Sequence, residues 1–305
     1  MAKGLSKKTK RRHKRNLKQR RKRYTRKFTV RGGNPSDTST GEVYHLSSCD
    51  KCHYGDNLFI LKFLYNISEK MKERNKKAIL YYNDGHVGNV KELEQYLDTN
   101  TVTLKPLKEA PPDRHKLWMG DPIDGIDHLN MEEYFKKFYT KMLNIMGMSD
   151  MNIDTSLYQD EKYLLDIYKR INETHGEKYK NVDILILNSE PKSNQLMGFN
   201  NDKMNKMCMF FRDKYKIVTS VPVDDTITST MRDGLTMRDI GAISTSVKYI
   251  IAVNSGPFVP CYNLYTKNNV KKVILLVDGQ WPFKEMNVVC MSNIDDPVNL
   301  ENHLK

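Results

Sequence analysis

Strand-length apolar runs alternate with segments of helical periodicity along most of the chain. Three of the runs, at residues 182–187, 249–253 and 273–277, are almost wholly apolar. A strand that is buried on both faces has such an uninterrupted run of apolar residues. Strands of this kind belong to parallel sheets that are covered by helices. The alternation therefore predicts an α/β fold with parallel strands joined by right-handed crossovers.

The same rhythm occurs twice, with a polar stretch at residues 147–156 between the two halves. In the first half we expect strands at 42–46, 78–82 and 101–104, and helices from about residue 57, over 87–97 and over 131–145. Asn130 is the expected N-cap of the last of these helices, with Glu133 in the capping-box position. The prediction is an N-terminal Rossmann-like domain at residues 41–150.

The second half, residues 151–305, is predicted to be a second Rossmann-like domain. Its expected strands are 182–187, 217–220, 249–253 and 273–277, and its expected helices are 164–171, 204–211, 236–247 and 261–265. Thr236, followed three residues later by Asp239, is the expected N-cap of the third helix. Two such doubly wound domains that face each other form a cleft.

The positive charge of the chain is concentrated at its start. The formal net charge is +13, from 50 Lys and Arg and 37 Asp and Glu. Residues 1–33 hold 16 basic residues and no acidic one, so the rest has 34 basic and 37 acidic residues, a net of −3. We expect residues 1–40 to be a disordered tail, because like charges with few apolar side chains do not form a core.

Three roles are open for this tail. It can bind a polyanion or nucleic acid non-specifically through residues 1–33, which is the role that we favour because few of its side chains can stack on bases. It can be a nuclear address, or it can attach the chain to a particle or an anionic surface.

Composition excludes several other classes. No run of 18 apolar residues is present, so no membrane span is expected. Five cysteines, an odd and sparse number, argue against a disulfide scaffold and for a reducing compartment, cytoplasmic or nuclear. Cys49, Cys52 and His53 lack the second ligand pair of a structural zinc site, so no metal site is expected and both thiols are predicted to be reduced.

Ligands of open α/β sheets gather where strands end and helices begin, so four turns are candidate sites. In the first, Asp56 follows Gly55 near the expected start of a helix. It is either a general base or only the N-cap of that helix, which is the commoner role of Asp there. In the second turn, Ser189 and Lys192 follow a buried strand and suit a diphosphate, with an ordinary polar loop and a solvated Lys as the alternative.

The third turn contains Asp224 and Asp225. Their carboxylates can bind sugar hydroxyls, but an acidic turn exposed to solvent is the simpler interpretation, and we favour it slightly. The fourth is the most specific: Asn254, Ser255, Gly256 and Pro257 follow residues 249–253 and open an expected helix. Glycine allows close backbone approach, and proline suits a first helical turn. The sequence predicts an anion cradle here, with a tight turn that holds no ligand as the alternative.

Three of these patches together resemble GT-B glycosyltransferases of the heptosyltransferase-like kind. Residues 235–257 (LTMRDIGAISTSVKYIIAVNSGP) are similar to the family's helix, strand and D-S-G-P turn, with Asn254 at the place of the usual Asp. Residues 55–67 (GDNLFILKFLYNI) are similar to its "GD plus apolar helix" element, and residues 186–192 (ILNSEPK) to its donor-phosphate loop. The richness in Lys, Asn, Tyr and Met also resembles proteins of large DNA viruses, which implies virion association.

The resemblance implies a GT-B architecture and metal-independent transfer of a sugar from a nucleotide-sugar to an acceptor that the sequence leaves open. It implies Asp56 as catalytic base and no cofactor beyond the nucleotide-sugar co-substrate. The implied donor-binding residues are Ser189, Lys192, Asn254, Ser255, Gly256 and Pro257. The alternative is a catalytically inactive, glycosyltransferase-like structural or nucleic-acid-associated protein that acts through its basic tail. A nicotinamide-dependent oxidoreductase is disfavoured, because no G-x-G-x-x-G follows the first strand.

Overall fold

The computed structural model describes residues 41–87, 89–118, 131–192, 196–279, 287–292, 294 and 296–305. The disordered tail at residues 1–40, its polyanion binding and the Asn130 cap are predictions that lie outside the described residues. Residues 41–305 form one compact unit.

The first sheet is parallel and has the strand order β3-β2-β1-β4. Its strands are β1 (Glu42–Ser47), β2 (Lys76–Tyr82), β3 (Val102–Pro106) and β4 (His115–Lys116). Alternate residues of the sheet, such as Leu46, Leu80 and Val102, point to one face and enter the same hydrophobic cluster as helices α2 and α6. The helical segments of this half are α2 (Tyr54–Asn66), α3 (Ser68–Glu73), α4 (Asp84–Val87), α5 (Val90–Glu94), η1 (Leu107–Glu109) and α6 (Met131–Ile145).

The second sheet is also parallel, with the order β10-β9-β8-β5-β6-β7. Its strands are β5 (Ile184–Leu187), β6 (Ile217–Thr219), β7 (Thr228–Ser229), β8 (Tyr249–Val253), β9 (Lys272–Leu276) and β10 (Val288–Met291). Numbered along the chain, this is the 3-2-1-4-5-6 order of a Rossmann sheet. The chain reverses its direction of growth between β5 and β8, which makes the carboxyl ends of these two strands the topological switch point.

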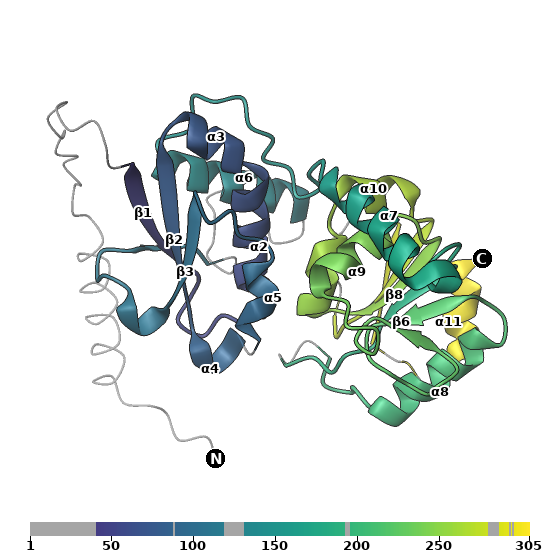
Figure 1. Cartoon of the computed structure of the whole chain (residues 1–305). Helices are drawn as coiled ribbons and strands as arrows, with labels where there is room; N and C mark the ends of the chain where they lie inside the picture. Colours follow the sequence, from purple (N-terminus) through teal and green to yellow (C-terminus); the bar gives the residue numbers. More distant parts are fainter. Residues whose placement is uncertain are drawn as a thin grey trace, which may run out of the picture. The chain divides into compact units, whose positions relative to one another are not determined.

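Helices cover both faces of the second sheet (Figure 1). Leu185 and Ile250 belong to one hydrophobic cluster together with side chains of α7 and α9. Ile186 and Ile251 belong to another, together with side chains of α8 and α11. The helical segments are α7 (Tyr163–His175), η2 (Gly176–Lys178), α8 (Asn201–Arg212), α9 (Met237–Ser244), η3 (Gly256–Cys261), α10 (Leu264–Asn269) and α11 (Pro297–Leu304). The predicted α/β class with parallel sheets is confirmed.

Helix α2 links the two sheets. It is apolar almost all round, a pattern typical of a helix buried on every side. The ring of Phe59 lies 4.5 Å from that of Phe135 in α6 and 5.5 Å from that of Tyr262, just after η3. The ammonium group of Lys62 pairs with the buried Glu161 at 3.1 Å and donates to the carbonyl of Tyr262 at 2.9 Å. The first sheet is therefore joined to the second by a shared core that contains a buried ion pair.

Three expected helices differ from the observed ones. Helix α2 begins at Tyr54 rather than near residue 57, with His53 as N-cap. The segment 87–97 is not one helix, because the Asn89 side chain accepts from the N–H of Lys91 and starts α5 there. The helix expected at 261–265 is replaced by η3 and α10, and the Asn263 side chain caps α10.

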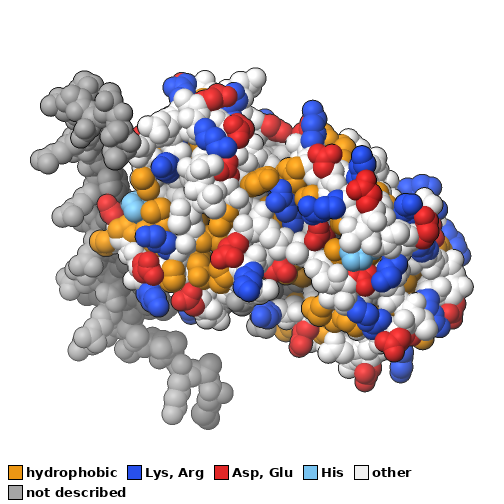
Figure 2. All heavy atoms as spheres, viewed as in Figure 1, with side chains coloured by type: hydrophobic (Ala, Val, Ile, Leu, Met, Phe, Trp, Pro, Cys, Tyr) orange, Lys and Arg blue, Asp and Glu red, His pale blue; other side chains and the backbone are white. Residues whose placement is uncertain are grey.

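The expected domain boundary at residue 150 lies in the loop between α6 and α7, and it stays a prediction. Over the face shown in Figure 2, Lys and Arg side chains are interspersed with Asp and Glu. This mixture agrees with the charge balance of −3 outside residues 1–33.

Candidate functional site

Two of the four predicted turns meet at the switch point of the second sheet. Strand β5 pairs with β8 so that Leu187 lies beside Ala252. The turn that contains Ser189 and the turn that contains Asn254 therefore begin side by side, at the edge where parallel α/β sheets bind ligands.

This edge holds buried polar atoms without partners. The Asn254 side chain is 7% exposed, and its Nδ2 has no hydrogen-bond partner among the described residues. The Oγ of Ser189 is also buried and without a partner in the described part of the chain. Leaving a buried donor unsatisfied costs about 1–3 kcal/mol, so such groups usually serve a ligand or an ordered water.

Asn188 fixes the shape of this edge. Its Oδ1 accepts from the N–H of Val221 at 2.9 Å and from the Oγ of Ser220 at 3.1 Å, and its Nδ2 donates to the carbonyl of Val221. These bonds tie the turn after β5 to the turn after β6. The sequence gives no signal for this role beyond the position of Asn188 directly after an apolar strand.

The other predicted donor-binding residues at this edge have no buried side-chain polar atom that lacks a partner among the described residues. Lys192 is exposed and has no ion pair with any described residue. The Oγ of Ser255 donates to the carbonyl of Val253 at 3.2 Å, so its hydroxyl proton is already used. Pro257 lies at the start of η3.

The helix expected to open at the fourth turn is a 3₁₀ segment of six residues, Gly256–Cys261. Pro260 lies inside it and has no N–H to donate, which limits the segment to a short 3₁₀ form. A segment of this length has little macrodipole, so the expected helix-dipole cradle for an anion is not present. Any anion site at this edge must depend on side chains and single N–H groups.

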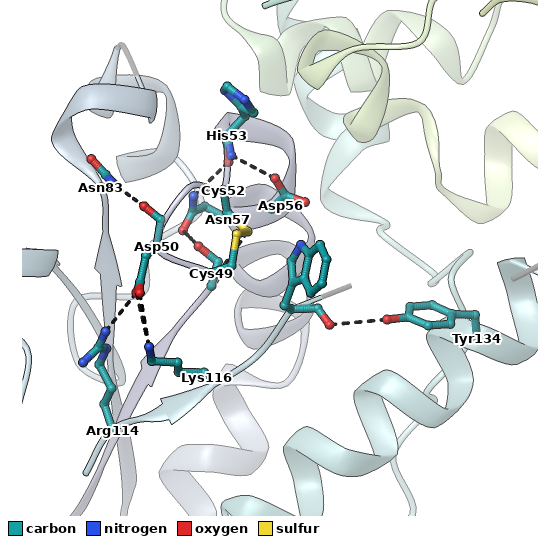
Figure 3. Close-up of a disulfide and its surroundings, with 12 residues drawn as sticks. Cys49, Asp50, Cys52, His53, Asp56, Asn57, Asn83, Arg114, Lys116 and Tyr134 are labelled. Atoms are coloured by element: carbon teal, nitrogen blue, oxygen red, sulfur yellow. Dashed lines mark hydrogen bonds and ion pairs between the residues drawn. A yellow bond between two sulfur atoms is a disulfide. The ribbon is translucent and has the colours of Figure 1, made fainter. Parts of the chain in front are cut away.

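Asp56 lies in the first turn of α2 rather than at its N-cap. Its Oδ2 accepts the N–H of His53 at 2.9 Å, which is the carboxylate half of a capping box (Figure 3). Burial raises the pKa of this carboxyl above its usual value, and the hydrogen bond from His53 opposes the shift. The carboxyl is thus a structural cap whose proton affinity is increased by burial.

The structure brings the first and fourth predicted turns together. A Cβ at Gly256 would lie 3.0 Å from Cδ1 of Tyr54 and 3.5 Å from the backbone nitrogen of Gly55. The close approach that the structure shows at Gly256 is that of the start of α2, whereas the approach of a ligand there stays a prediction. Asp56 follows directly after this contact.

Tyr54 is a polar residue that the sequence did not single out. Its hydroxyl is buried and has no hydrogen-bond partner among the described residues. Burial, together with the charge of Glu92, raises its pKa, so the phenol stays protonated at neutral pH. Apart from its place before the Gly55–Asp56 pair, no pattern in the sequence marks it.

The third predicted turn is accounted for by local structure. Asp224 accepts from the N–H groups of Thr226 and Ile227 and pairs with Arg212 at 3.2 Å. This is a turn stabilised by its own carboxylate. The simpler of the two predictions for this turn agrees with these contacts.

The prediction for the cysteines of the first turn was wrong. Cys49 and Cys52 form a disulfide. The N–H of Cys52 donates to the carbonyl of Cys49, and this tight turn brings the two Cα atoms to 5.0 Å, within the range that a disulfide spans. The pair also lies directly before α2, closer to a helix start than the sequence suggested.

Within the described residues, no group of three or more His, Cys, Asp or Glu side chains is placed to hold a metal ion. None of the helices in the described ranges is long and apolar enough to cross a membrane.

Comparison with known proteins gives one remote likeness to report. No family model matches the chain. No curated protein matches it. Among solved structures it is similar to the crystal structure of the glycosyl transferase family 9 from Veillonella parvula DSM 2008. That likeness has a TM-score of 0.45 and 10% sequence identity, and it covers 89% of this chain and 94% of the other.

Proposed function

We propose that this protein is a glycosyltransferase of GT-B architecture whose nucleotide-sugar donor binds at the switch point of the second sheet. The proposal is carried by two buried polar atoms at neighbouring strand ends, Nδ2 of Asn254 and Oγ of Ser189, neither of which has a hydrogen-bond partner among the described residues. Both lie at the sheet edge where Rossmann folds bind nucleotides. The sequence patches that resemble the heptosyltransferase-like family include these same residues.

The donor diphosphate would be held by neutral and cationic donors. The Asn254 amide and the Ser189 hydroxyl would donate to phosphate oxygens, and Lys192, which is exposed at the same turn, would supply positive charge. The N–H groups of Ser255 and Gly256, followed by Pro257, would complete the site. We propose that the reaction needs no metal, because these groups offset the charge of the leaving diphosphate.

Asp56 is the proposed base. As an acceptor hydroxyl attacks the anomeric carbon, the Asp56 carboxylate would take its proton, and the bond from that carbon to the diphosphate would break. The raised pKa of Asp56 suits this role, since a base is most effective when its pKa lies closer to the working pH. The contact between Gly55 and Gly256 supports the proposal that Asp56 and the donor turn act together.

A second candidate is a catalytically inactive glycosyltransferase-like protein that acts through residues 1–33. The observation that favours it is the hydrogen bond from His53 to Asp56, which gives the carboxylate a complete structural role. In that case a polyanion would bind to the 16 basic residues at positions 1–33 of the tail.

Thermal unfolding of the full chain with UDP-, GDP- and ADP-sugars separates the two candidates. A ligand that binds only the folded state at 100 times its Kd stabilises it by about 2.7 kcal/mol, so one nucleotide class should raise the unfolding temperature clearly. Sodium chloride at the same ionic strength is the control for a simple salt effect. No shift with any nucleotide-sugar would favour the second candidate.

A further inference from the structure

The disulfide between Cys49 and Cys52 lies in the short segment between β1 and α2 (Figure 3). The two cysteines differ in their exposure to solvent. Cys49 is half-buried, whereas Cys52 is 2% exposed. An external thiol can therefore approach only one end of the bond with ease.

We propose that Cys49–Cys52 is a redox-active disulfide that exchanges reversibly with small dithiols. This activity does not depend on the proposed sugar transfer. Cys49 is the sulfur that an external thiolate attacks, and Cys52 is the leaving group.

The surroundings of Cys52 favour its departure as a thiolate. Its Sγ accepts the N–H of Cys49 at 3.0 Å. It also lies two residues before Tyr54, the first residue of the 13-residue helix α2, whose N-terminus carries partial positive charge. Both features stabilise a departing thiolate against the effect of its burial, and a better stabilised thiolate departs faster.

The exchange is balanced in two steps. The thiolate of a dithiol attacks Sγ of Cys49, the Cys49–Cys52 bond breaks, and Cys52 leaves as a thiolate. The second thiol of the dithiol then attacks the mixed disulfide and releases Cys49. The two electrons come from the dithiol, which becomes a disulfide, and its two protons end on solvent or on the cysteines.

The loop that holds the disulfide is anchored independently of it. Asp50 pairs with Arg114 at 3.0 Å and with Lys116 at 3.2 Å, both near the end of the first sheet. On the helix side, the Oγ of Ser48 donates to Oδ1 of Asn57 at 2.9 Å. Because these bonds remain when the disulfide opens, the cysteines stay close and the bond can form again.

Two other cysteines provide an internal contrast. Cys208 and Cys261 are buried, and desolvation raises the pKa of each thiol to about 12. They are protonated at neutral pH and inaccessible, so they are inert in the folded chain.

The test is thiol mapping by mass spectrometry on the full chain. After dithiothreitol and then alkylation under native conditions, we expect a rapid label on Cys49, a much slower one on the buried Cys52, and none on Cys208 or Cys261. Removing the reductant and adding oxidised glutathione should restore the disulfide. A bond that opens only when the chain unfolds, or thiols that do not pair again, would overturn the proposal.

Two single variants test the assigned direction of attack. With oxidised glutathione, Cys52→Ser should gain one glutathionyl group on Cys49 at least about tenfold faster than Cys49→Ser gains one on Cys52, because only Cys49 is accessible. Cys290→Ser is the matched control and should leave the exchange of the wild-type pair unchanged. Equal rates in the two variants would contradict the assignment.

Discussion

The Asp56 carboxylate has an observed role as a cap and a proposed role as a base, and substitution can separate the two. It caps α2 through the N–H of His53, and its raised pKa makes it a better base. Asparagine keeps an oxygen that accepts the same N–H but cannot take a proton, whereas alanine removes both. The two substitutions therefore separate the base from the cap.

We expect Asp56→Ala to lower the free energy of unfolding by about 1 kcal/mol through loss of the cap, and Asp56→Asn to retain most of it. Both should abolish sugar transfer without loss of nucleotide binding. Urea unfolding and a transfer assay check this pair. Normal turnover by Asp56→Asn would show that the carboxylate is a cap alone.

The pH dependence of stability follows from the same group. Its folded-state pKa is raised above the unfolded value, so the folded state binds the proton more tightly. The stabilisation is complete below about pH 4, the unfolded pKa, and is lost as the pH rises through the folded pKa. Relative to Asp56→Asn, the wild type should therefore lose stability as the pH rises above the unfolded pKa. An unchanged difference would contradict the raised pKa.

At the scale of elements, the first residues of α2 and η3 lie in close contact, and Gly256 has no side chain that would keep them apart. A methyl group at 256 would lie 3.0 Å from Cδ1 of Tyr54, tighter than normal packing, whereas one at Gly198 would meet no atom within 4 Å. The contact brings Tyr54 and Gly55, the two residues before Asp56, against the proposed donor turn.

Gly256→Ala should therefore destabilise the chain by about 1–3 kcal/mol, the usual cost of overpacking, and weaken nucleotide binding. Gly198→Ala is the matched control and should change neither property. Urea unfolding of both variants measures the difference. Equal free energies of unfolding for the two variants would mean that α2 and η3 can move apart to accommodate a methyl group at position 256.

At the scale of the whole molecule, the α/β class and most strands of the second sheet could be predicted, because their side chains are buried on both faces. Ile184–Leu187 and Tyr249–Val253 are continuous apolar runs for that reason. Strands β4, β7 and β10 span two to four residues, and only tertiary pairing defines them. The Cys49–Cys52 disulfide was missed because it depends on a turn conformation that spacing does not determine.

The candidate site was predicted in part for similar reasons. The positions of Ser189 and Asn254 follow from strand ends, which the sequence marks. The absence of partners for their buried polar atoms within the described residues, and the contact of Gly256 with Tyr54, depend on packing between distant segments. The buried ion pair between Lys62 and Glu161, which helps to link the two sheets, forms between residues about a hundred positions apart, so no local pattern predicts it.

Calorimetric titration of nucleoside diphosphates into the full chain tests the proposed donor site most directly. We expect one binding site for one nucleotide. Ser189→Ala/Asn254→Ala loses two hydrogen bonds to charged oxygens, each worth about 1.5–3 kcal/mol, and should bind about 10²- to 10⁴-fold more weakly. Ser246→Ala, an exposed serine that precedes the opposite end of β8, should bind like wild type. Absence of binding by the wild type, or undiminished binding by the double variant, would show that the donor site is not at this sheet edge.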